Sequence, residues 1–71
     1  MSELELLNHI GKKIRLIRLE RKMTQDDLGA KCNLEKARLS KIENGLANPT
    51  VRSLSRICEA LEIKIADLFC D

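Results

Sequence analysis

The chain has 71 residues and a formal net charge of +2, so it can form one small domain that hides only about 60% of its unfolded surface. No apolar run approaches the roughly 18 residues that a membrane-spanning helix needs. The acidic N-terminal segment also lacks the basic start and cleavage site of an export signal. We therefore expect a single soluble cytoplasmic domain over residues 1–71, with no membrane partner.

Few residues suited to catalysis or metal binding are present. The cysteines Cys32, Cys58 and Cys70 are widely spaced, and His9 is the only histidine. This pattern fits neither a zinc site nor a disulfide framework, so we expect no metal and no cofactor. Cys58 is expected in the core as a reduced thiol, whereas Cys70 is the thiol to watch for intermolecular oxidation. No nucleophile and base stand in a recognisable arrangement, which argues against an enzyme.

The first two predicted helices follow from apolar spacing and from start and stop signals. Glycine, proline and aromatic residues are scarce and no alternating strand pattern appears, so we expect an all-α chain. A helix over about residues 4–22 would bury a stripe formed by Leu7, Ile10, Ile14 and Ile17. Thr24 and the acids after it predict the start of a second helix over residues 25–32. Asn33, which tolerates a left-handed conformation, would end that helix.

Three more helices are predicted after a tight turn. The third is expected at about residues 35–43, with Leu34, Leu39 and Ile42 as its apolar positions and Asn44-Gly45 as its end. The fourth would start after Thr50 and end near Glu62, with the Asn48-Pro49 pair marking the loop before it. A short fifth helix would carry Ile65, Leu68 and Phe69.

Basic residues cluster in two segments of the chain. Residues 12–22 hold six basic side chains against the single acid Glu20, and Lys36, Arg38 and Lys41 form a second cluster. By composition alone, a solvated helix face explains either cluster better than a nucleic-acid site does. The arrangement of the second and third helices favours the other interpretation, because a short turn between them would leave the second of the pair outside with its N-terminal end free.

The run MTQDDLGAKCNLEKARLSKIENG, followed by NPTVRSLSRICEALEI and ADLF, resembles the Cro and C1 repressor type of helix-turn-helix family. The resemblance covers about residues 10–69 and puts the helix-turn-helix at about residues 24–43. It implies a five-helix lambda-repressor-like domain whose third helix enters the major groove of double-stranded DNA.

The resemblance also implies a role for individual residues. Those that match groove-facing, base-contacting positions are Lys36, Ala37, Arg38 and Lys41. Those that match phosphate-contacting positions are Thr24, Gln25, Asn44, Asn48, Thr50 and Arg52. Arg18 and Glu43 match a pair that links the first helix to the end of the third, and a structural ion pair is favoured there over a DNA contact.

Five positions depart from the family pattern. Lys22, Asn33 and Glu62 stand where relatives usually have glycine, so we expect the corresponding turns to differ. Gly29 replaces the usual alanine and would let the third helix approach closely. Glu35 replaces a common Ser or Thr cap, and it either accepts a bond from cytosine N4 or complements the helix dipole.

The C-terminal end is expected to form a homodimer interface through Ile63, Ile65, Leu68 and Phe69. Burial of Ile65 and Leu68 within one chain is the alternative for those two positions. A two-fold dimer would present its two copies of the third helix about 34 Å apart, matching an inverted repeat in the DNA. Leu16 and Leu19 lie off the core stripe and suggest extra packing with the C-terminal segment.

The expected function is that of a transcriptional regulator without a small-molecule ligand, since no sensor region is present. Its length resembles that of phage Cro proteins and of the controller proteins of restriction-modification systems. The alternative is an antitoxin-like or other protein-binding module with secondary DNA binding, although such modules commonly append a tail and only Cys70 and Asp71 follow the predicted fifth helix.

Overall fold

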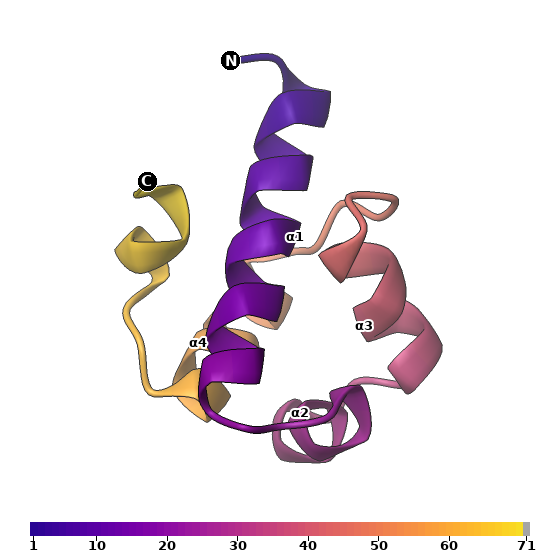
Figure 1. Ribbon diagram of the computed structural model, residues 1–71. Coiled ribbons are helices and arrows are strands. Elements are labelled where there is room, and N and C mark those ends of the chain that lie inside the picture. The colour runs from indigo at the N-terminus through magenta and orange to yellow at the C-terminus, as the bar shows by residue number, and fades with distance from the viewer. Residues whose placement is uncertain (71) are drawn as a thin grey trace.

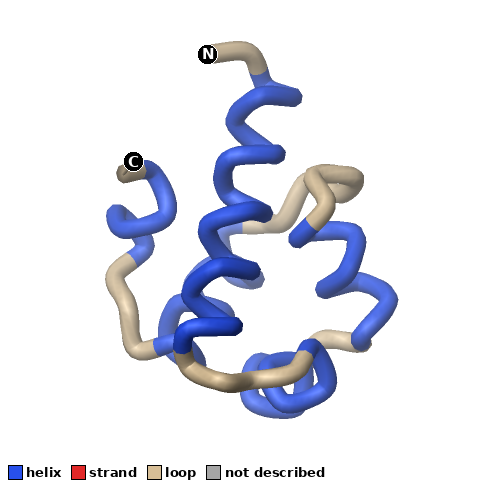
Figure 2. Tube along the Cα trace, viewed as in Figure 1, coloured by secondary structure: helices blue, strands red, loops and turns tan. Residues whose placement is uncertain are grey.

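The computed structural model describes residues 1–70, which form four α-helices followed by one 3₁₀ helix. Figure 1 and Figure 2 show α1 crossing the front of the molecule, α2 below it, α3 at one side and α4 behind. The elements are α1 (Glu3–Glu20), α2 (Gln25–Cys32), α3 (Lys36–Glu43), α4 (Val51–Leu61) and η1 (Ile65–Phe69). Within residues 1–70, no helix has both the length and the apolar content for a membrane crossing.

The predicted fifth helix is a 3₁₀ helix, not an α-helix. η1 has only five residues, and its Asp67 amide donates to the carbonyl of Lys64, three positions earlier, at 2.9 Å. A segment this short has few positions for the i→i−4 hydrogen bonds of an α-helix. A single 3₁₀ turn needs only i→i−3 hydrogen bonds. The apolar spacing therefore located the segment, and its hydrogen-bond pattern comes from the structure.

Side-chain caps decide where the longer helices begin. The Ser2 hydroxyl accepts a hydrogen bond from the Glu5 amide at 3.1 Å, and the Glu5 carboxylate accepts one from the Ser2 amide. This capping box starts α1 one residue earlier than the spacing predicted. Thr24 and Asp27 form the same reciprocal pair at the start of α2, and Thr50 caps α4 through the Ser53 amide.

The turns at Lys22, Asn33 and Glu62 keep the left-handed conformation that glycine would favour, with φ of 57°, 57° and 59°. The expectation that these turns differ from the family pattern is therefore wrong. A non-glycine residue in this region costs on the order of 1 kcal/mol. Each turn is held by a bond from the next amide back to a carbonyl five positions earlier, at 2.9 to 3.0 Å, which satisfies the end of the preceding helix.

The core lies where α1, α2, α3, α4 and η1 meet. α1 contributes Ile10, Ile14 and Ile17, as its stripe predicts. Leu6 and the predicted Leu7 are both half-buried, and of the two it is Leu6 that packs on this core. The remaining buried apolar side chains are Leu28, Cys32, Leu39, Ile42, Leu54, Ile57, Cys58, Leu61 and Leu68. Burial raises the pKa of the Cys32 and Cys58 thiols, which keeps them neutral as core residues.

Two glycines bring α3 into backbone contact with its neighbours. A Cβ atom on Gly11 of α1 would lie 2.5 Å from the Ile42 carbonyl oxygen and 2.6 Å from that of Glu43. A Cβ atom on Gly29 of α2 would lie 2.6 Å from the Leu34 carbonyl oxygen. Because both clashes are with backbone, neither can be relieved by a side-chain rotation. The two glycines therefore fix the two ends of α3 against α1 and α2.

Leu16 and Leu19 do not gain the extra packing that their apolar character suggested. Each is 53% exposed on the outer face of α1. The reason is geometric, since η1 packs along α1 with Leu68 turned into the core and leaves the outer face of α1 uncovered.

Candidate nucleic-acid interface

α3 has one buried and one exposed side. Leu39 and Ile42 are almost completely buried, and they hold the helix against α1 and α2. The opposite side is exposed and carries the predicted base-contacting residues Lys36, Ala37, Arg38 and Lys41. The helix lies at one side of the molecule (Figure 1), and its basic side chains are exposed.

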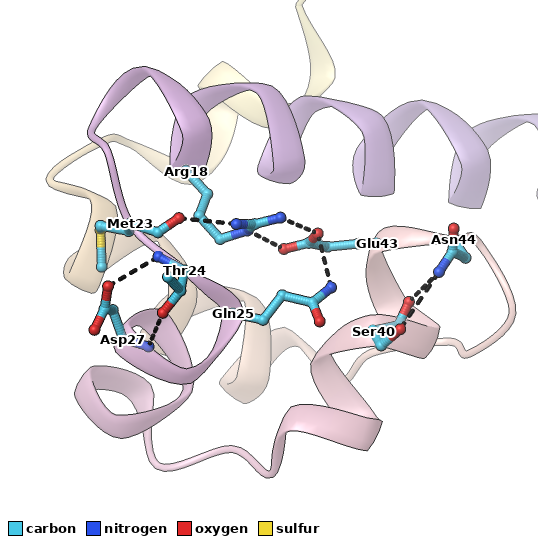
Figure 3. A network of polar contacts seen from close by, with 8 residues as sticks. All are labelled: Arg18, Met23, Thr24, Gln25, Asp27, Ser40, Glu43 and Asn44. Atoms are coloured by element: carbon cyan, nitrogen blue, oxygen red, sulfur yellow. Dashed lines mark hydrogen bonds and ion pairs between the residues drawn. The ribbon is translucent and has the colours of Figure 1, made fainter.

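Arg18 and Glu43 form a buried ion pair between the last turn of α1 and the last residue of α3 (Figure 3). Arg18 Nε donates to Glu43 Oε2 at 2.8 Å, and one terminal guanidinium nitrogen donates to Oε1 at 3.0 Å. The other terminal nitrogen donates to the Met23 carbonyl at 2.8 Å. One guanidinium group therefore ties together α1, the turn before α2 and the end of α3.

Both partners of this ion pair are well removed from water. The Arg18 and Glu43 side chains are 9% and 2% exposed, and charges this deep are costly unless every donor and acceptor is satisfied. Within residues 1–70, no buried side-chain nitrogen or oxygen lacks a hydrogen-bond partner. Gln25 completes the arrangement because its side-chain amide donates to Glu43 Oε1 at 3.2 Å.

The predicted phosphate-contacting residues fall into two groups. Thr24, Gln25, Asn44 and Thr50 already use their side chains inside the molecule, in caps or in the network of Figure 3. A phosphate contact from these positions would draw on backbone amides or on a remaining side-chain N–H or O–H group. Asn48 and Arg52 are exposed beside the start of α4.

Two acids near the start of α2 have different surroundings. The Asp27 carboxylate accepts a 2.9 Å bond from the Thr24 amide, and this bond, with that from the Thr24 hydroxyl, lowers the pKa of Asp27. Asp26 instead faces α3, with Oδ2 lying 4.0 Å from Lys36 Nζ. Sequence reasoning missed this contact, because the distance between residues on α2 and α3 depends on the angle of the turn. Glu35 makes no side-chain cap bond at the start of α3.

The C-terminal residues predicted at a dimer interface do not form one exposed set. Leu68 is completely buried in its own chain, so its assignment to the interface is wrong: η1 packs on α1 and α4 and turns this side chain into the core. Ile63 is half-buried against the same core. Ile65 and Phe69 are 37% and 51% exposed.

The comparisons with known proteins agree with this geometry. The helix-turn-helix profile HTH_3 matches residues 14–68, so the chain belongs to the Cro/C1-type helix-turn-helix family.

Curated relatives and solved structures are similar over most of the chain. The chain is 36% identical to control protein C.BamHI of Bacillus amyloliquefaciens, over 82% of this chain and 73% of that protein. It is 39% identical to the immunity repressor protein of Bacillus phage phi105, over 80% of this chain but only 40% of the repressor. The crystal structure of the wild-type restriction-modification controller protein C.Esp1396I has 41% identity and a TM-score of 0.82, over 90% of this chain and 83% of that one.

The chain spans two fifths of the length of the phi105 repressor, and the same share of the regulator SlrR of Bacillus subtilis. The controller protein C.AhdI from Aeromonas hydrophila has a TM-score of 0.87 over 89% of this chain and 96% of that one. With 24% identity, it supports the fold.

The buried ion pair leads to a stability prediction. Arg18→Met leaves the Glu43 carboxylate buried without its cation, so we expect the free energy of unfolding to fall by about 3 to 5 kcal/mol. Arg15→Met, on the exposed side of the same helix, should change it by no more than about 0.5 kcal/mol. Urea unfolding followed by circular dichroism measures both. Equal losses for the two variants would contradict the stated role of the pair.

Proposed function

We propose that this chain is a sequence-specific DNA-binding transcriptional regulator that inserts α3 into the major groove of double-stranded DNA. The observation that carries the proposal is the basic exposed side of α3, on a helix whose other side and both ends are fixed. An α-helix fits the major groove, where each base pair presents a distinct set of donors and acceptors. Residues 1–71 would act as a single helix-turn-helix domain.

Each exposed side chain of α3 has a chemical role in this proposal. Lys36, Arg38 and Lys41 are donors suited to guanine O6 and N7, and the Ala37 methyl group suits contact with a thymine methyl. The backbone amides at the start of α2, together with Asn44, Asn48, Thr50 and Arg52, would hold the phosphates on either side of the groove. Phosphate contacts would fix the orientation of the protein, while the α3 side chains would supply the sequence preference.

The active form is a homodimer in this proposal. One half-site of a few base pairs gives limited specificity, and two copies related by a two-fold axis would read an inverted repeat with centres about 34 Å apart. Ile65 and Phe69 offer exposed apolar surface at the C-terminal end, and Ile63 is half-buried. The names of similar proteins, control protein and immunity repressor, support a regulatory role.

Base contacts by α3 can be separated from phosphate contacts. Alanine at Lys36, Arg38 or Lys41 should cost about 1 to 3 kcal/mol on a preferred duplex and relax the preference at one base position. Arg52→Ala should instead weaken binding to every duplex by a similar factor, because a phosphate contact carries no sequence information. Fluorescence anisotropy on a set of single-base variants measures both effects. A uniform loss for all three α3 variants would contradict base contact.

The dimer surface predicts a second result. Phe69→Glu should give monomers in sedimentation equilibrium, because a charge cannot be buried there without a partner. Leu16→Glu is the matched control, since Leu16 is exposed to the same degree on α1, and it should leave the dimer intact. The reverse pattern would put the interface on the outer face of α1, and a dimer that survives both changes would exclude both surfaces.

A further inference from the structure

The first turn of α2 carries an exposed acid that the helix does not need for its cap. The hydrogen bonds that start α2 come from Thr24 and Asp27, which bond each other's backbone amides at 2.9 and 3.0 Å. Asp26, between Gln25 and Asp27 in the chain, takes no part in them, and its side chain is 74% exposed. The same helix start is where the proposed function expects a DNA phosphate, and a carboxylate there repels one.

The Asp26 carboxylate faces a predicted base-contacting residue on the neighbouring helix. Its Oδ2 atom lies 4.0 Å from Nζ of Lys36, the first residue of α3, and the Lys36 side chain is 64% exposed. The two groups are ten positions apart in the chain, and the turn between α2 and α3 brings them together. The acid thus stands beside one of the three cationic side chains on the exposed side of α3.

We propose that Asp26 is a specificity-determining residue that competes with the DNA phosphates for the Lys36 ammonium group and so keeps that group available to the bases. This inference rests on the proposed DNA-binding function. Lys36 has a flexible four-carbon stem and an ammonium group with three donors. The 4.0 Å separation from Asp26 Oδ2 is too long for a hydrogen bond, so the attraction is electrostatic and all three N–H donors remain for guanine O6 and N7. The acid therefore restricts the lysine without using up its capacity for base contact.

The effect differs between a preferred site and any other duplex. Binding to a duplex that lacks the preferred sequence depends almost wholly on phosphate contacts. The repulsion between Asp26 and the phosphates weakens this binding, and the restraint on Lys36 weakens it further because the lysine is less available to a phosphate. At a preferred site the repulsion remains, but the restraint favours the bound orientation of Lys36 and offsets part of it. Asp26 consequently increases the ratio of the two affinities while lowering binding to DNA in general.

A purely structural role for Asp26 predicts something else. Acids in the first turn of a helix interact favourably with its dipole, and in that role Asp26→Asn would lower stability without changing the affinity ratio. The net charge alone predicts a third result, in which removing one acid strengthens binding to all duplexes equally.

The test compares Asp26→Asn with the wild-type protein on a preferred duplex and on a scrambled duplex of the same length and composition, at one fixed salt concentration. We expect affinity for the scrambled duplex to rise about three- to fivefold and affinity for the preferred one to change less than about twofold. The same substitution in a Lys36→Met background should raise both affinities by an equal factor, because the restrained lysine is gone. Glu20→Gln, an equal charge change at the exposed end of α1, is the control and should leave the ratio unchanged.

The outcomes separate this inference from the function on which it rests. A wild-type preference that Asp26→Asn leaves unchanged, or changes by the same factor with and without Lys36, overturns the role of Asp26 alone. A folded wild-type protein that prefers no duplex overturns the proposed function, and the inference falls with it. A ratio that falls only when Lys36 is present supports the inference.

Discussion

The position of the exposed basic helix depends on the buried ion pair between Arg18 and Glu43. Removing both charges from water costs several kcal/mol per ion in principle. That cost is offset here because three guanidinium nitrogens and both carboxylate oxygens have partners within 3.2 Å. A pair with this many directional bonds allows one arrangement of the two helices. A small domain with a limited core gains a defined relation between α1, α2 and α3 from this contact.

Gly11 and Gly29 help to position the same helices because they have no side chain. Gly11 allows the α1 backbone to touch the carbonyl groups at the end of α3, close to Glu43, and Gly29 allows α2 to touch the Leu34 carbonyl just before α3 begins. The ion pair and the two close approaches therefore hold α3 at both ends. Side chains that discriminate between bases need such a rigid support, because a displacement of about 1 Å removes a good hydrogen bond.

Local signals in the sequence predicted most of the helix boundaries. α2 has its predicted limits because Thr24 and Asn33 both act locally, through a cap and a left-handed turn. α3 begins one residue later than predicted, and Glu35 at its start makes no cap hydrogen bond. Glu62 adopts a left-handed conformation in spite of its intrinsic cost, since the bonds that close the turn come from the neighbouring backbone.

Contacts that depend on the angles between helices could not be predicted from local sequence signals. The apolar pattern marked Leu68 for burial but could not tell whether its own chain or a partner covers it. The resemblance pointed to Arg18 and Glu43, yet nothing in the sequence indicated that the Met23 carbonyl and the Gln25 amide complete their network. The contact between Asp26 and Lys36 likewise depends on the angle between α2 and α3.

The most direct measurement of whether α3, held in this way, reads DNA sequence is selection of bound duplexes from a random pool by the purified protein. Sequencing after several rounds at moderate salt should reveal an enriched inverted repeat whose half-sites lie about one helical turn apart. A pool that stays random, with the protein still folded and binding DNA, would contradict sequence recognition by α3. It would leave only phosphate contacts to explain the basic surface.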